Sequence, residues 1–170
     1  MPRIHVCSLQ RLDETVRRTG ARSIVTLIDH GFAVSRPTEI AASDHLCVGI
    51  SDIVEPVDGY VLPSETHVEQ FLGFVRRWDR RDPMVIHCYA GVSRSTAAAF
   101  IAACALAPEY PEQVFATRIR CASPTATPNA RLVALADVTL DRKGRMIAAI
   151  DAIGRGVDCY EGVPFALDLT

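Results

Sequence analysis

The segment from residue 83 to residue 107 constrains the fold more than any other part of the chain. Residues 83–88, PMVIHC, have the continuous apolar character of a buried strand. Residues 95–107, STAAAFIAACALA, predict a helix that is apolar on all sides and that ends before Pro108. A helix without a polar face must lie in the middle of a fold, so this pair predicts a sheet with a helix packed against it.

The preceding part of the chain alternates between strand and helix patterns. Strands are expected at 4–9, 22–29 and 44–52, and helices at 10–20 and 63–81. Beyond residue 107 only helices are expected, at 110–123, 127–140 and 143–156. The predicted fold class is therefore α/β, a small, mostly parallel central sheet flanked by helices, with a helical C-terminal part. We expect a single domain over residues 1–170, with a core at about 4–137 and a helical C-terminal extension at about 138–170.

Composition argues against several classes of function. A net charge of −2 gives no basic field that would attract nucleic acid or an anionic membrane. No run of 18 apolar residues could span a bilayer, and the first residues lack the pattern of a secretory signal. The six cysteines are scattered without a CxxC motif, which favours reduced thiols in the cytoplasm over a zinc site or disulfides. All but one of the 18 basic residues are arginine, which suggests a bacterium with a GC-rich genome.

Residues 87–95, HCYAGVSRS, join the predicted buried strand to the N-terminus of the buried helix. Such a junction collects unpaired backbone N–H groups and the positive end of a helix dipole, which together attract an anion. Ala90 and Gly91 let the backbone approach a tetrahedral anion closely, and Arg94 supplies a planar fork of donors for two of its oxygens. The same positive environment favours the thiolate form of Cys88, which is the nucleophilic form.

The motif His87-Cys88-x5-Arg94-Ser95 resembles the signature of the cysteine-based protein tyrosine phosphatases, and most of all that of the dual-specificity branch. The order of elements over about residues 4–137 is also similar to that family. The resemblance implies a phosphatase fold and hydrolysis of phosphate monoesters through a phosphocysteine. The expected substrate is protein phosphotyrosine, or phosphoserine and phosphothreonine, or a small phosphate monoester. Phosphate, sulfate and vanadate should inhibit, and no metal or other cofactor is implied.

The resemblance also implies a role for each residue of the motif. Cys88 attacks phosphorus, Arg94 binds the phosphate oxygens, and Ser95 helps the thiolate to leave in the second step. His87 orders the loop. Asn129 either braces the loop or serves as an ordinary helix N-cap. The remaining phosphate-binding groups belong to Tyr89, Ala90, Gly91, Val92 and Ser93.

The general acid is expected in the loop that follows the third strand. Asp52 and Asp58 precede Cys88 by 36 and 30 residues, and both spacings suit the family. Asp52 is preferred, because it lies where the strand ends and its backbone is better anchored. Asp58 stands beside Gly59 in a loop rich in proline and glycine, where a role in a turn is expected.

Two alternatives remain open from the sequence. The chain could be a phosphoprotein-binding module that retains the loop without efficient chemistry. It could also be a rhodanese-like sulfurtransferase, although the cysteine loop of those proteins is usually shorter and the pair Arg94-Ser95 is not expected there. The loop contains no lysine and no second arginine, which disfavours an inositol lipid as substrate.

Overall fold

The computed structural model describes residues 3–170, which form a five-stranded sheet and six α-helices. The sheet has the strand order β3-β2-β4-β1-β5. Its strands are β1 (Arg3–Ser8), β2 (Ser23–Ile28), β3 (His45–Gly49), β4 (Met84–Cys88) and β5 (Phe165–Asp168). The first four strands are parallel to one another, and β5 pairs with β1 in the antiparallel direction. Parallel β1–β4 pairing places Ser8 opposite Cys88.

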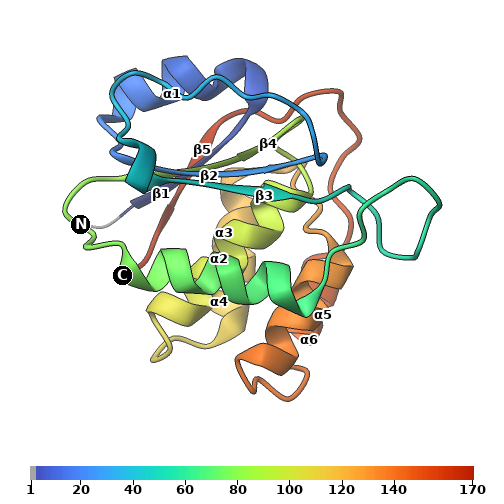
Figure 1. The fold of residues 1–170 in the computed structure, drawn as a ribbon. Helices are drawn as coiled ribbons and strands as arrows, with labels where there is room; N and C mark the ends of the chain where they lie inside the picture. Colours follow the sequence, from blue (N-terminus) through green and yellow to red (C-terminus); the bar gives the residue numbers. More distant parts are fainter. Residues whose placement is uncertain (1–2) are drawn as a thin grey trace.

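Helices cover both faces of this sheet (Figure 1). They are α1 (Leu12–Thr19), α2 (Glu65–Arg77), α3 (Arg94–Leu106), α4 (Glu112–Ala122), α5 (Ala130–Thr139) and α6 (Arg145–Ile153). The one-turn 3-10 helices η1 (Leu9–Arg11) and η2 (Ala42–Asp44) precede α1 and β3. The predicted fold class, a mostly parallel sheet flanked by helices, is confirmed. None of the helices found between residues 3 and 170 is long and apolar enough to cross a bilayer.

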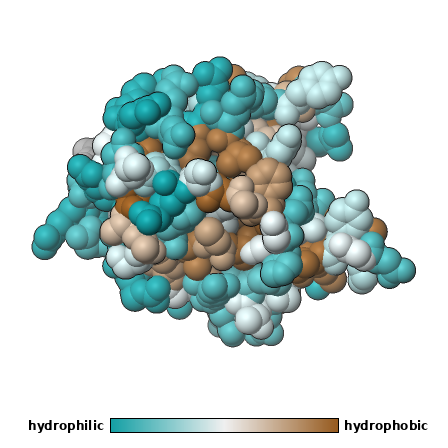
Figure 2. All heavy atoms as spheres, turned by 45° about the horizontal axis from the view of Figure 1, so that its top comes forward, coloured by the Kyte–Doolittle hydropathy of each residue, from teal (hydrophilic) through white to brown (hydrophobic). Residues whose placement is uncertain are grey.

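The alternation of side chains along β4 separates two hydrophobic clusters. Val85 packs on the α1 side of the sheet with Leu12 and Val16. Ile86 and Cys88 belong to the larger cluster on the other side, which includes most of α3. Nearly all of α3 is buried there, as its lack of a polar face predicts. On the face shown in Figure 2, hydrophobic side chains gather in a central area that hydrophilic residues surround.

The sequence analysis missed β5, because it expected only helices after residue 107. In this strand Phe165 and Leu167 point inward and join the larger cluster, while the neighbouring residues are only partly buried. Four residues give too short an alternation to indicate a strand from sequence alone. The strand exists because β1 offers an edge, and Arg3 Nε donates to Asp168 Oδ1 at 2.6 Å across that edge.

Residues 154–164, here called the strap, connect α6 to β5 without helix or strand. In Figure 1 the strap is the red segment that leads from α6 back to the sheet. Ahead of it, Asp137 of α5 holds the start of α6 by accepting from the backbone N–H groups of Gly144 and Met146 at 2.7 and 2.8 Å. Met146 and Ile150 of α6 belong to the same cluster as the sheet residues, so the strap begins and ends on the main core.

Candidate active site

The loop between Cys88 and Arg94 lies at the carboxyl edge of the parallel strands. Cys88 ends β4 and Arg94 begins α3, so the loop is tied at both ends to buried elements. Ligands of parallel α/β folds bind at this edge, where strands end and helix N-termini begin. The structure therefore gives the loop the strand-to-helix position that the sequence predicts.

Gly91 needs to be glycine for two separate reasons. Its φ of +73° lies in the left-handed region that side chains disfavour. A Cβ atom there would also lie 2.8 Å from the carbonyl carbon of Cys7 and from the backbone nitrogen of Ser8. The close approach to β1 lets the N–H of Gly91 turn toward Cys88, and it donates to Sγ at 3.3 Å.

Four carbonyl groups of the loop accept hydrogen bonds from backbone N–H groups of other segments. Since the C=O and N–H of a trans peptide point to opposite sides, these bonds turn the N–H groups of the following residues inward. The four bonds are Leu9 N→Tyr89 O at 3.1 Å, Gly162 N→Ala90 O at 2.9 Å, Thr127 N→Val92 O at 2.9 Å and Asn129 N→Ser93 O at 3.2 Å. The loop is therefore held in a form that presents donors to an anion before any anion binds.

Arg94 is held by one side of its guanidinium. Its Nη1 donates to the carbonyl oxygen of Ile50 at 2.8 Å and lies 3.4 Å from Oδ1 of Asp29. Its Nε is buried and has no acceptor among residues 3–170. A buried donor without an acceptor is costly. The guanidinium therefore fits an oxyanion that would accept from Nε.

Cys88 is buried, with 2% of its surface exposed, and its sulfur has two polar neighbours. Sγ is hydrogen-bonded to Oγ of Ser95 at 3.1 Å, in addition to the N–H of Gly91. Both groups can donate to a thiolate. The two residues that the sequence analysis pairs as nucleophile and assisting hydroxyl are thus in direct contact.

His87 lies on the opposite side of β4, in a buried polar chain. Its Nε2 is 2.7 Å from Oγ1 of Thr26, which is also 2.7 Å from Nε2 of His45. Burial lowers the pKa of His87 to about 4, so its ring is neutral near pH 7. A neutral, fully buried imidazole bonded to the neighbouring strand fixes the end of β4 directly before Cys88.

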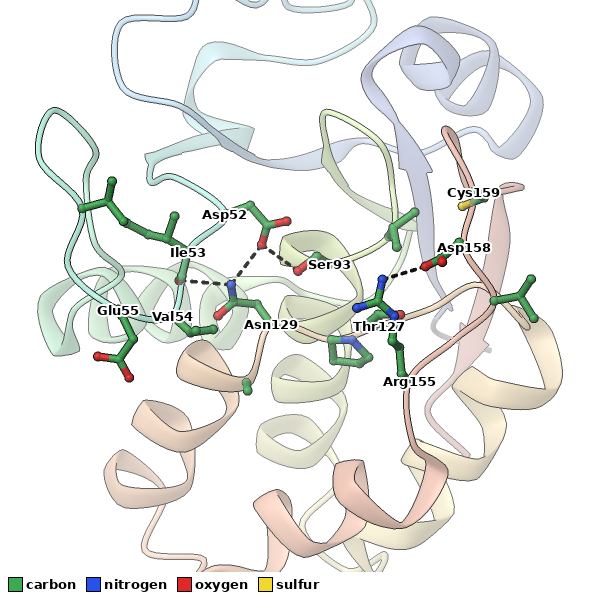
Figure 3. A pocket seen from close by; sticks show the side chains of 15 residues that line it. Asp52, Ile53, Val54, Glu55, Ser93, Thr127, Asn129, Arg155, Asp158 and Cys159 are labelled. Atoms are coloured by element: carbon green, nitrogen blue, oxygen red, sulfur yellow. Dashed lines mark hydrogen bonds and ion pairs between the residues drawn. The ribbon is translucent and has the colours of Figure 1, made fainter.

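Asp52 is brought to the loop by two hydrogen bonds to one of its oxygens. Oδ1 accepts from Oγ of Ser93 at 2.7 Å and from Nδ2 of Asn129 at 3.0 Å (Figure 3). Its Oδ2 has no hydrogen-bond partner in the described part of the chain. This carboxyl group is therefore oriented by one oxygen while the other can act on a ligand.

The loop that contains Asp52 and Asp58 is closed at its base. Ser51 N donates to Val61 O at 2.9 Å, and Val61 N donates to Ser51 Oγ at 3.2 Å. Asp52 directly follows this closed base. Asp58 is exposed in the outer turn, where Tyr60 N donates to Val57 O at 3.1 Å. In Figure 1 the loop between β3 and α2 extends away from the body of the protein. Asp52 contacts Ser93 of the Cys88–Arg94 loop, whereas Asp58 lies in the exposed outer turn.

Asn129 combines the two roles that the sequence left open. Its Oδ1 accepts from the N–H of Leu132 at 3.0 Å, which caps α5. Its backbone N–H braces Ser93, and its Nδ2 faces Asp52. Because the cap fixes the amide oxygen, the amide nitrogen is left to orient the carboxylate. Nothing in the sequence signals this last contact, which joins residues 77 positions apart.

A cavity of about 650 Å³ opens beside Asp52 and Ser93. The Asp52 segment forms one wall, and residues 127–130 lie between the two sides. The strap forms the opposite wall, where Arg155 Nη2 pairs with Asp158 Oδ1 at 2.6 Å (Figure 3). The lining of the cavity includes Val92 and Ser93 of the loop but neither Cys88 nor Arg94, so the cavity lies beside the loop and not over the nucleophile.

A model of the family described as "Polymorphic toxin system, DSP-PTPase phosphatase" matches residues 8–107, more than half of the chain. The chain belongs to this family. It is therefore a phosphatase of the protein-tyrosine and dual-specificity type. No curated protein matches the chain.

Solved structures of similar fold include other phosphatases. DUSP15 has a TM-score of 0.66 at 15% identity, over 90% of this chain and 91% of its own. The PTP-2 phosphatase of Cydia pomonella has a TM-score of 0.62 at 20% identity, over 79% and 84%. A mouse putative dual specificity phosphatase complexed with zinc tungstate has a TM-score of 0.58 at 19% identity, over 86% and 84%. At these identities the likeness concerns the fold.

The part of this phosphatase that sequence reasoning missed at the site is the strap. Arg155 and Asp158 line the cavity, and Gly162 contacts the Cys88–Arg94 loop. These residues lie beyond the end of the family match at residue 107. The only local signals are glycines: Gly156 and Gly162 both lie where a Cβ would meet backbone atoms at 2.8 Å or less. Only the folded chain shows which backbone each of them approaches.

Proposed function

We propose that this phosphatase hydrolyses phosphate monoesters through a phosphocysteine on Cys88, with protein phosphotyrosine as its main substrate. The observation that carries the proposal is the surrounding of the buried Cys88 sulfur. Sγ is hydrogen-bonded to Gly91 N–H and Ser95 Oγ, at the base of a loop that ends in Arg94. This arrangement combines a nucleophile with donors for the oxygens of a tetrahedral phosphate.

In the first step the Cys88 thiolate attacks phosphorus in line with the leaving oxygen. The S–P bond forms, the P–O bond breaks, and its electron pair passes to the leaving oxygen. That oxygen takes the proton of the Asp52 carboxyl group. The inward N–H groups of the loop and the free donors of Arg94 hold the other three oxygens of the phosphoryl group.

In the second step water attacks the phosphocysteine. The Asp52 carboxylate takes a proton from that water as its oxygen bonds to phosphorus. The S–P bond breaks and its electron pair returns to sulfur, where the Ser95 hydroxyl donates to the thiolate from 3.1 Å. Inorganic phosphate leaves, and Asp52 again carries the proton needed for the next cycle. These steps require no metal ion and no other cofactor.

Asp52 is the general acid in this proposal, because it is the loop aspartate that the fold directs toward Ser93. Asp58, the alternative from the sequence, lies in the outer turn and is exposed. The two hydrogen bonds to Oδ1 leave Oδ2 to carry the transferred proton.

An aromatic rim supports a phosphotyrosine substrate. Tyr89 of the loop and Phe32 are both exposed and stack edge to face, with ring centroids 6.3 Å apart. A phosphotyrosyl ring could pack there while its phosphate reaches the loop. Phosphate, sulfate and vanadate should compete for the same donors, and tungstate, the oxyanion bound in the mouse structure, has the same tetrahedral shape.

We propose that the protein is bacterial, as its arginine-rich composition suggests, and that it acts in the cytoplasm, because all six cysteines are free thiols. The description of the family names a polymorphic toxin system. We propose that removal of phosphate from proteins of a target cell inhibits its growth. Expression of the wild type should then slow growth of a host, and expression of the Cys88→Ser variant should not. Equal inhibition by both would contradict a catalytic toxin.

The decisive test of the activity compares wild type with Cys88→Ser. The substrates are p-nitrophenyl phosphate and peptides that carry phosphotyrosine, phosphoserine or phosphothreonine. Wild type should release phosphate, fastest from phosphotyrosine, and a rapid quench with ³²P-labelled substrate should trap label on Cys88. The variant should bind phosphate without turnover. Binding without turnover by the wild type would favour a phosphoprotein-binding module, and sulfur transfer from thiosulfate to cyanide would favour a sulfurtransferase.

A further inference from the structure

The peptide unit between Ala90 and Gly91 is hydrogen-bonded on both of its sides. Its carbonyl oxygen accepts from the backbone N–H of Gly162, in the strap, at 2.9 Å. Its N–H donates to Sγ of Cys88 at 3.3 Å. The bond is trans, so its C=O and N–H point in opposite directions. The strap therefore holds the outer side of the peptide whose inner side contacts the sulfur.

We propose that Gly162 is a positioning residue for the Cys88–Arg94 loop. It acts through Ala90 and does not touch the substrate. Its N–H keeps the Ala90 carbonyl turned outward, which keeps the N–H of Gly91 aimed at the sulfur and the bound oxyanion. Bonds in such a chain polarise one another, so the outer bond also strengthens the inner donor. This inference rests on the proposed function of the loop.

Only glycine fits at position 162 while the strap lies this close to the Cys88–Arg94 loop. A Cβ atom would lie 2.8 Å from the carbonyl oxygen of Gly91 and 3.4 Å from Cγ2 of Val92. The first neighbour is a backbone atom of the loop itself, and it cannot rotate away as the end of a side chain could. A side chain here would therefore push either the strap or the loop out of position.

The rest of the strap is anchored firmly enough to act as a support. Val157 N donates to Pro124 O at 3.0 Å, and Gly156 N donates to Thr127 Oγ1 at 3.0 Å. Near Gly162, Oγ of Ser8 donates to Oε1 of Glu161 at 2.5 Å. The strap is thus fixed on both sides of its exposed middle, and the loop gains a donor whose position does not depend on the ligand.

The pairing of β5 with the edge strand β1 does not account for the hydrogen bond between Gly162 and Ala90. The pairing of β5 with β1 involves Phe165–Asp168, which begins three residues after Gly162. The neighbouring residue Val163 is 77% exposed and belongs to the same stretch of chain. It therefore serves as a matched control for changes that only disturb the approach to β5.

The test compares Gly162→Ala with Val163→Ala. For each variant, kcat and KM for p-nitrophenyl phosphate, inhibition by orthovanadate and thermal unfolding are measured. In Gly162→Ala the added methyl group should displace the strap and break the hydrogen bond from residue 162 to Ala90. This loss should reduce kcat/KM and orthovanadate affinity about tenfold. Both variants should unfold within a few degrees of each other, with Val163→Ala retaining wild-type kinetics. Wild-type orthovanadate affinity in Gly162→Ala, or an equal loss in Val163→Ala, would overturn the proposal.

Hydrogen exchange of the wild type provides a second measurement that does not require a variant to fold. Orthovanadate should slow exchange at the N–H of Gly162 and leave the exposed Tyr160 unchanged, because anion binding and loop order are reciprocally coupled. Unchanged exchange at Gly162 with orthovanadate bound would contradict the positioning role. Absence of Cys88-dependent turnover in the wild type would instead contradict the proposed function. The two failures are therefore distinguishable.

Discussion

Asn129 Nδ2 donates to Asp52 Oδ1 at 3.0 Å, across 77 residues of chain. The same side chain caps α5 through its other atom, Oδ1. The fold of the C-terminal helices is thereby linked to the orientation of one carboxyl group. Because Nδ2 of Asn129 contacts Asp52 and Oδ1 caps α5, a substitution that keeps the cap can test the contact with Asp52 by itself.

Asp52→Asn should reduce turnover of an alkyl or tyrosyl phosphate by roughly two to three orders of magnitude, the range for general acid catalysis. The loss should be smaller for an aryl phosphate whose phenolate leaves without a proton. The measurement is kcat/KM against the pKa of the leaving group, with Asp58→Asn as control. If only Asp58→Asn shows the dependence on the leaving group, Asp58 is the acid.

Asn129→Ser should retain a capped α5 while losing the donor to Asp52, because serine is also a good N-cap. Turnover of phosphates with poor leaving groups should fall roughly five- to tenfold, since such a hydrogen bond contributes roughly 1 to 1.5 kcal/mol. Asn129→Ala loses the cap as well and should unfold with a free energy lower by about 1 kcal/mol. Denaturant unfolding and kinetics of both variants separate the two effects. Wild-type activity of Asn129→Ser would contradict the orienting role.

Arg94→Lys should weaken both phosphate binding and the chemical step. An ammonium group cannot reach Ile50 O, as Nη1 does at 2.8 Å, and also donate to two phosphate oxygens. We expect KM to rise and kcat to fall, each by at least about tenfold. Steady-state kinetics and orthovanadate inhibition measure the two effects. Near-wild-type values would show that Arg94 does not face the phosphate.

Stability should decrease as the pH falls from 7 toward 4. Burial lowers the pKa of His87 from 6.5 to about 4, so within this window the unfolded chain binds a proton that the folded chain does not. The contribution of His87 is a loss of up to roughly 3 kcal/mol in the free energy of unfolding. Urea unfolding at several pH values measures it. His87→Asn should make the free energy of unfolding depend less on pH, and His30→Asn, at an exposed position, should not. An equal pH dependence in the wild type and both variants would refute the assignment to His87.

EDTA should leave the activity unchanged, and orthovanadate should inhibit competitively. The proposed chemistry is carried by Cys88, Arg94 and Asp52, and vanadate can adopt the five-coordinate geometry of the transferred phosphorus. Initial rates at several substrate concentrations test both statements. Loss of activity on chelation, with recovery on adding a divalent metal, would indicate a metal-dependent hydrolase instead.

The central strand, α3 and the loop between them could be predicted because their signals are local. A continuous apolar run, a helix without a polar face and the small residues before Arg94 all lie within 25 residues of one another. Side-chain periodicity and backbone freedom within such a segment hardly depend on what surrounds it. The sequence also favours Asp52 over Asp58 as the general acid on local grounds, since the end of a strand is better anchored than the middle of a loop, and this remains a prediction.

Tertiary structure alone decided which distant groups complete the site. The strap bond from Gly162 to Ala90, the contact between Asn129 and Asp52, and strand β5 join segments far apart in the chain. No local pattern encodes them, because each depends on where α4, α5 and α6 place the backbone that follows. The sequence by itself determined the fold class, and it predicts the nucleophile and the anion-binding loop. The packed fold determined how the loop carbonyls are held and how the acid is oriented, since hydrogen bonds over such separations form only after the helices have packed.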